Sequence, residues 1–185
     1  MTRNIIFLLD SSRSMNEQIG ATTKFQLAIQ AIKKVITNPN PERTEDTLSV
    51  ILCWTELLKG FQKEVLYKDV PMSVYVSPQK LNQFSEAKNN AYTSVDRGIE
   101  YAIQFLLGKD GDKVIKLITD GVGVEPLRVD YLTSELQKNS IQFDCIMIGD
   151  EGKQENLKRI VQNLGTGRFS IVFTIESLVN ALQTI

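Results

Sequence analysis

Residues 5–15 read Ile5-Ile6-Phe7-Leu8-Leu9-Asp10-Ser11-Ser12-Arg13-Ser14-Met15. An unbroken apolar run of this length, ended by a polar cluster, is typical of a strand that is buried on both faces of a sheet. The polar side chains at positions 10, 12 and 14 alternate along the chain, so an extended or turning loop would direct them to one side. We therefore predict a buried strand followed by a loop that carries a polar site.

The same alternation of buried strands and amphipathic helices continues along the chain. The next buried run spans residues 48–54, and the short turn after it predicts an antiparallel edge strand at 61–67. The remaining patterns predict strands at 114–119, 141–148 and 169–173, and helices at 24–36, 77–84, 93–107, 126–138, 154–164 and 176–182. This order predicts an α/β fold with a doubly wound, mostly parallel six-stranded sheet, one antiparallel edge strand and helices on both faces, as in Rossmann-like proteins.

Length and charge narrow the class of protein. The 185 residues suit one globular domain of ordinary size, so we expect residues 1–185 to form a single domain. With 21 Lys and Arg against 22 Asp and Glu, the chain lacks the basic excess that binds nucleic acid regardless of sequence. The apolar run near the start is too short to span a membrane. We therefore expect neither nucleic acid nor a membrane as the partner.

The rare residue types narrow the chemistry further. Histidine is absent from the sequence, which excludes Ser-His-Asp and Cys-His catalysis and histidine-ligated zinc. Cys53 and Cys145 each lie inside an apolar run without CxxC spacing, so we expect two buried thiols and no redox or zinc pair. Reduced cysteines and the lack of any Asn-x-Ser/Thr acceptor favour a cytoplasmic location. Any metal in this chain must be bound by oxygen.

Oxygen-bearing side chains gather in three predicted loops. Asp10, Ser12 and Ser14 follow the first strand, Asp120 follows the strand at 114–119, and Thr93 precedes a helix. Because ligands of open α/β sheets lie beyond the carboxyl ends of the strands, we expect all five residues on one edge of the sheet. Two carboxylates and three hydroxyls are hard ligands, and they suit Mg²⁺ (or Mn²⁺) in a site with an incomplete protein shell.

In order and setting, these five residues resemble the Asp-x-Ser-x-Ser…Thr…Asp set of the von Willebrand factor type A (VWA) domain, where it forms the metal ion-dependent adhesion site (MIDAS). The resemblance covers essentially the whole chain. It implies that Ser12, Ser14 and Thr93 approach the cation through hydroxyls, whereas Asp10 and Asp120 act largely through water. It also implies a protein partner that supplies a Glu or Asp to the open coordination position.

Two positions depart from the family pattern. Arg13 stands where the family often has Gly, and Asp96 stands where Gly commonly follows the Thr by three residues. Arg13 could repel the ion or contact an acidic partner, whereas Asp96 could act near the metal or simply favour the N-terminus of a helix. The short chain with its early motif also resembles stand-alone bacterial proteins of the tellurium-resistance (TerY-like) type, which implies a stress-response complex.

Two other functions compete with a metal-dependent binding module. A Mg²⁺-dependent phosphohydrolase of the haloacid dehalogenase type also begins with an Asp after the first strand, but it needs an acid/base Asp two residues on, where this chain has Ser12. A metal-independent scaffold would retain the fold and bind partners through its helices or sheet edge. We therefore predict a non-enzymatic protein-binding module and keep these two readings as alternatives.

Overall fold

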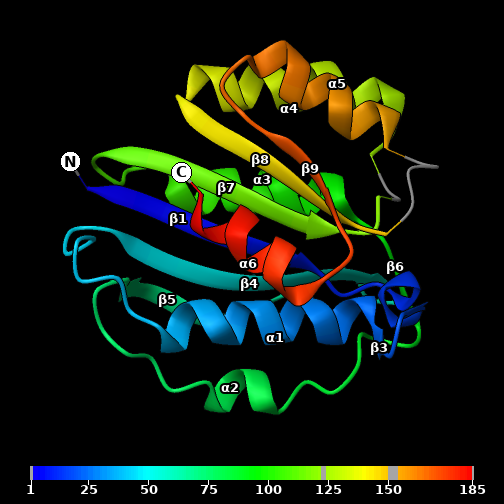
Figure 1. Cartoon of the computed structure of the whole chain (residues 1–185). Helices are drawn as coiled ribbons and strands as arrows, with labels where there is room; N and C mark the ends of the chain where they lie inside the picture. Colours follow the sequence, from blue (N-terminus) through cyan, green and yellow to red (C-terminus); the bar gives the residue numbers. More distant parts are fainter. Residues whose placement is uncertain (1, 122–123, 150–153, 185) are drawn as a thin grey trace.

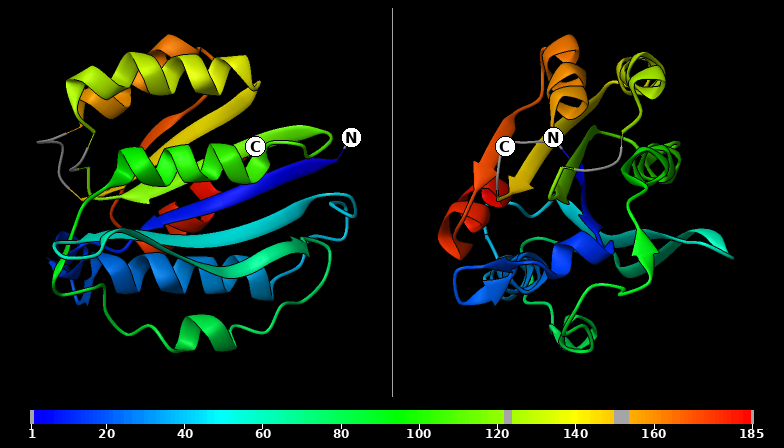
Figure 2. Two further views of the ribbon diagram at one scale, coloured as in Figure 1. Left: turned by 180° about the vertical axis from the view of Figure 1, so that it is seen from behind. Right: turned by 90° about the vertical axis from the view of Figure 1, so that its right-hand side faces the viewer.

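A sheet runs through the centre of the molecule and carries helices on both faces (Figure 1, Figure 2). The computed structural model describes residues 2–121, 124–149 and 154–184. The main strands lie in the order β5-β4-β1-β7-β8-β9, with bounds β1 Arg3–Asp10, β4 Thr47–Glu56, β5 Gly60–Pro71, β7 Asp112–Thr119, β8 Ile141–Ile148 and β9 Phe169–Val172. All neighbours on this path are parallel except β4 and β5, which confirms the predicted antiparallel edge strand.

Strand β1 lies inside the sheet because its side chains are apolar on both faces. Ile5, Phe7 and Leu9 pack into one hydrophobic cluster, and Ile6 and Leu8 pack into the cluster on the opposite face. The strand pairs in parallel with β4 on one side and with β7 on the other. The apolar run therefore forms the doubly buried strand that the sequence predicts, and its carboxyl end leads directly into the polar loop.

Among the described residues, six α-helices cover the two faces of the sheet, as the periodicity predicts. Buried side chains of α1, α2 and α6 belong to one hydrophobic cluster, and those of α3, α4 and α5 belong to the other. The helices span α1 Lys24–Thr37, α2 Gln79–Asn82, α3 Val95–Leu106, α4 Pro126–Lys138, α5 Glu155–Leu164 and α6 Ile175–Gln183. Figure 2 shows α1 and α6 on one side of the sheet and α3 and α4 on the other. This arrangement confirms the doubly wound α/β fold.

Three short strands and one turn are additional to the predicted elements. The six predicted strands account for the main path of the sheet, but β6 (Ala91–Tyr92) adds a seventh that pairs antiparallel with the end of β4. A separate ribbon forms from β2 (Gln18–Ile19) and β3 (Thr22–Thr23), and η1 (Arg13–Asn16) is a single 3₁₀ turn. Two-residue strands are too short to show alternation, so the sequence pattern does not reveal them.

The structure also bears on the predictions about membrane spans and about the two cysteines. Within the described ranges, no helix has both the length and the apolar character that crossing a membrane requires. Both cysteines are buried free thiols, as the sequence predicts. Burial raises the pKa of Cys53 above the usual range of a thiol, so this cysteine stays protonated at neutral pH.

Gly98 in α3 lies directly against Cys53 in β4. A Cβ placed on Gly98 would lie 2.7 Å from Cys53 Sγ. We expect Gly98→Ala to lower the free energy of unfolding by about 1–3 kcal/mol, because overpacking outweighs the gain in helix propensity. Urea denaturation measures the change. Cys53→Ala in the same chain should recover part of the loss, and purely additive effects would argue against this contact.

Candidate metal centre

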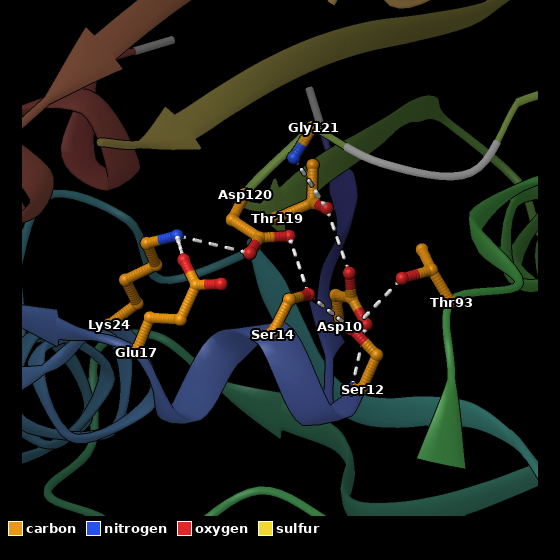
Figure 3. Close-up of polar contacts among 9 residues, drawn as sticks. All are labelled: Asp10, Ser12, Ser14, Glu17, Lys24, Thr93, Thr119, Asp120 and Gly121. Atoms are coloured by element: carbon orange, nitrogen blue, oxygen red, sulfur yellow. Dashed lines mark hydrogen bonds and ion pairs between the residues drawn. The ribbon is translucent and has the colours of Figure 1, made fainter. Parts of the chain in front are cut away.

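The predicted site residues meet at the carboxyl edge of the sheet, where β1 and β7 end as neighbours (Figure 3). Asp10 is the last residue of β1, and Asp120 directly follows β7. Strand β1 is also the point from which the chain winds toward both edges of the sheet, and such switch points are the usual ligand sites of open α/β sheets. Ser12 and Ser14 flank the start of turn η1, and Thr93 lies between β6 and α3.

Three hydroxyls and one carboxylate form a continuous row of oxygens. Thr93 Oγ1 donates to Ser12 Oγ at 3.0 Å, and Ser12 Oγ lies 3.2 Å from Ser14 Oγ. Ser14 Oγ in turn donates to Asp120 Oδ1 at 3.1 Å. Residues up to 106 positions apart in sequence are thereby brought into direct contact, and their oxygens face one another.

Asp10 lies beneath this row and is held by two different donors. Its side chain is buried, with Oδ1 accepting from the backbone N–H of Ser12 at 2.9 Å and Oδ2 accepting from Thr119 Oγ1 at 2.9 Å. Burial raises the pKa of Asp10 to about 7, and the nearby charge of Asp120 adds to this effect, while the hydrogen bonds from Ser12 and Thr119 oppose it. A nearby cation would favour the ionised form of this carboxyl.

The Asp120 carboxylate is also paired with the ammonium of Lys24, a residue outside the predicted set. Lys24 Nζ lies 3.2 Å from Asp120 Oδ2 and 2.6 Å from Glu17 Oε2. Thr119 was also outside the five predicted residues, although it directly precedes Asp120 in the sequence. The sequence does hold one signal for Lys24. It stands at the first position of a helix, where the helix dipole disfavours a cation, so a lysine there indicates a carboxylate partner elsewhere.

Arg13 and Asp96, the two residues that depart from the pattern named above, have different surroundings. Asp96 is engaged by Arg128, whose Nε lies 3.4 Å from Asp96 Oδ2, and it also accepts from Ser94 Oγ at 3.4 Å. Its carboxylate is therefore bound outside the row of hydroxyls. Arg13 is exposed at the start of η1, directly between two residues of that row in sequence.

The donor set fits a hard divalent cation. Its five members are all oxygen donors, and the two carboxylates supply up to two negative charges. Throughout the ranges that the structure describes, no group of three or more His, Cys, Asp or Glu residues could hold a metal. The chemistry of the site therefore depends on hydroxyls, which suit Mg²⁺ or Mn²⁺ better than softer ions.

Comparison with protein families agrees with this geometry. The family model for the von Willebrand factor type A domain matches residues 4–185. The chain belongs to this family. The match includes every strand end that carries a candidate site residue, and VWA domains are in general interaction modules. Comparison with curated protein sequences gave no match.

Solved structures show the same fold at low sequence identity. The SpRpn10 VWA domain is 18% identical, with a TM-score of 0.71 over 96% of this chain and 94% of that one. A von Willebrand factor type A protein from Catenulispora acidiphila is 19% identical with a TM-score of 0.72, and the alignment covers 97% of this chain and 41% of that one. Manganese-loaded TRAP protein from Plasmodium vivax is 14% identical with a TM-score of 0.66 over 97% and 71% of the two chains.

Proposed function

We propose that residues 1–185 form one VWA domain that binds a protein partner through a divalent cation, Mg²⁺ or Mn²⁺. The observation that carries this proposal is the row of hydroxyls from Thr93 to Ser14 that ends on the Asp120 carboxylate. In this proposal the site is a metal ion-dependent adhesion site, and its five residues are Asp10, Ser12, Ser14, Thr93 and Asp120. The manganese-loaded TRAP protein, which shares the fold, supports a divalent cation here.

The residues of the site divide into two roles in this proposal. The hydroxyls of Ser12, Ser14 and Thr93 would contact the cation, since they lie together on one side of the site. Asp10 and Asp120 would act largely through water and would supply the negative charge that attracts the ion. A bound divalent cation supplies a strong local positive charge with few direct anionic ligands. An Asp or Glu of the partner would then complete the coordination.

Exposed apolar side chains around the same edge support a protein partner. Leu57 and Leu58 form the tip of the turn between β4 and β5 and are 79% and 95% exposed. Tyr92, in β6 next to Thr93, is 60% exposed, and Leu127 at the start of α4 is 91% exposed. Solvated apolar side chains beside a polar site are typical of interfaces that bury them on binding.

The same reasoning leads us to propose a non-enzymatic role. A phosphohydrolase of the haloacid dehalogenase type would need a second carboxyl at position 12, and Ser12 Oγ instead lies in the row of hydroxyls.

We also propose a cytoplasmic setting, supported by two free buried thiols, and a TerY-like stress-response complex as the context. Loss of the complex in chelator would favour the metal-dependent module over the scaffold.

Metal titration tests the proposed site directly. Calorimetric titration of Mn²⁺ or Mg²⁺ into chelator-treated protein should show one site, and Ser12→Ala should weaken it by at least about tenfold, because a hydroxyl ligand is lost. Ser94→Ala is the matched control, since Ser94 Oγ contacts Asp96 and not the row. We expect the control to bind within about twofold of wild type. No binding by wild type at millimolar metal would refute the proposal.

A further inference from the structure

The ammonium of Lys24 is a fixed positive charge at the border of the proposed metal site. Its Nζ bridges Asp120 Oδ2 and Glu17 Oε2, at 3.2 and 2.6 Å, while Asp120 Oδ1 accepts from Ser14 Oγ (Figure 3). The side chain of Lys24 is only 13% exposed. Asp120 therefore lies between a lysine ammonium on one side and the hydroxyls proposed to hold the cation on the other.

Helix formation does not account for a lysine at this position. Lys24 is the first residue of α1, where the aligned backbone N–H groups make a cation unfavourable. Its aliphatic stem lies against Gly149 at the end of β8, since a Cβ on Gly149 would be 3.4 Å from Lys24 Cε. The two carboxylates and this close packing hold the ammonium in place against the local preference of the helix.

We propose that Lys24 opposes the divalent cation and thereby sets a low metal affinity for the site. This inference rests on the proposed metal site. Without metal, the ammonium balances the charge of Asp120; with metal, both cations share one carboxylate and repel each other. An acidic side chain from the partner would relieve this repulsion, so metal and partner should each strengthen the binding of the other. Lys24 would thus make metal occupancy depend on the partner.

The opposite role for Lys24 has a different experimental signature. If the lysine only positioned Asp120 for the metal, its removal would weaken metal binding. If it opposes the metal, removal of its charge tightens binding. Lys24→Met retains most of the aliphatic stem and removes the ammonium with its two hydrogen bonds, so the direction of the change in affinity separates the two roles.

Calorimetric titration of Mn²⁺ and of Mg²⁺ into chelator-treated wild type, Lys24→Met, Lys24→Gln and Lys24→Arg tests the inference. We expect Lys24→Met to bind metal about tenfold more tightly than wild type, because one like charge near the ion is removed. Lys24→Arg should stay near wild type. Lys34→Met is the matched control on the same helix, since Lys34 pairs with Glu176 at 3.5 Å and both side chains are mostly exposed.

Thermal unfolding gives a second readout, which does not depend on the heat of metal binding that calorimetry measures. Tm is compared between chelator and about 5–10 mM Mg²⁺, concentrations that suit a dissociation constant in the roughly millimolar range. The rise in Tm should be larger for Lys24→Met than for wild type. Unchanged or weaker metal binding by folded Lys24→Met and Lys24→Gln would overturn the inference and leave the metal site intact. Absence of metal binding by wild type, Lys24→Met and Lys24→Gln would overturn the metal site and the inference together.

Discussion

Replacing Lys116 by methionine is expected to lower the free energy of unfolding by about 3–5 kcal/mol, because the variant leaves a buried carboxylate without its cation. Lys116 lies in β7, and its side chain is completely buried. Its Nζ is 2.7 Å from Asp144 Oδ2 and donates to the backbone carbonyls of Ala181 and Thr184 at 3.1 and 2.7 Å. One ammonium thus joins β7 and β8 to the end of α6.

Urea denaturation measures this loss, and a neighbouring lysine provides the control. Lys113→Met, three residues earlier in the same strand, should stay within about 0.5 kcal/mol, because Lys113 is only partly buried and forms no ion pair among the described residues. Hydrogen exchange should also accelerate in α6 of Lys116→Met, where two carbonyls lose their donor. A loss of under 1 kcal/mol, roughly the worth of an exposed ion pair, would contradict the role of Lys116.

Asp10→Asn is expected to stabilise the metal-free protein at neutral pH and to abolish metal binding. The pKa of Asp10 is raised to about 7, chiefly by burial. The folded protein therefore keeps this proton over a pH range in which the unfolded chain loses it, and stability falls as the pH rises from about 4 to about 7. Between pH 5 and 7 this single ionisation costs about 2 kcal/mol of folding free energy. An uncharged isostere avoids that cost but removes the charge that attracts the cation.

Denaturant unfolding in chelator at pH 5, 6 and 7 measures the effect. The stability of Asp10→Asn relative to wild type should increase by about 2 kcal/mol across this range. Asp130→Asn is the control, because the Asp130 side chain is 84% exposed, and it should follow wild type at every pH. Saturating Mn²⁺ should remove much of the pH dependence from wild type, since the cation favours the ionised carboxyl. Parallel curves for wild type and Asp10→Asn would show that ionisation of Asp10 carries no cost.

Much of the candidate site could be predicted because its residues follow strand ends. Asp10 directly follows an apolar run and Asp120 directly follows strand β7, and parallel strands place such ends on one edge of a sheet. The structure brings all five predicted residues together on that edge. Their role as metal ligands stays a prediction, whereas their proximity follows from the order of the elements.

The partners of the charged groups could not be predicted in the same way. Lys24 and Asp120 are 96 positions apart and Thr119 and Asp10 are 109 positions apart, and no local pattern connects such residues. Lys116 stands in a run that otherwise reads as an ordinary buried strand, and only the contact with Asp144 explains a lysine there. Likewise, the pairing of Asp96 with Arg128 depends on how α3 and α4 pack.

The sequence alone determined the α/β class, the central place of the run at 5–9 and the loops that carry the five candidate residues. It could do so because periodicity and strand-end chemistry are local properties of the chain. Only the tertiary structure decided the surroundings of each charge: the burial of Asp10, the ammonium of Lys24 beside Asp120 and the buried pair of Lys116 and Asp144. These depend on distances between remote segments, since burial and neighbouring charge act through space and leave no periodic trace in the sequence.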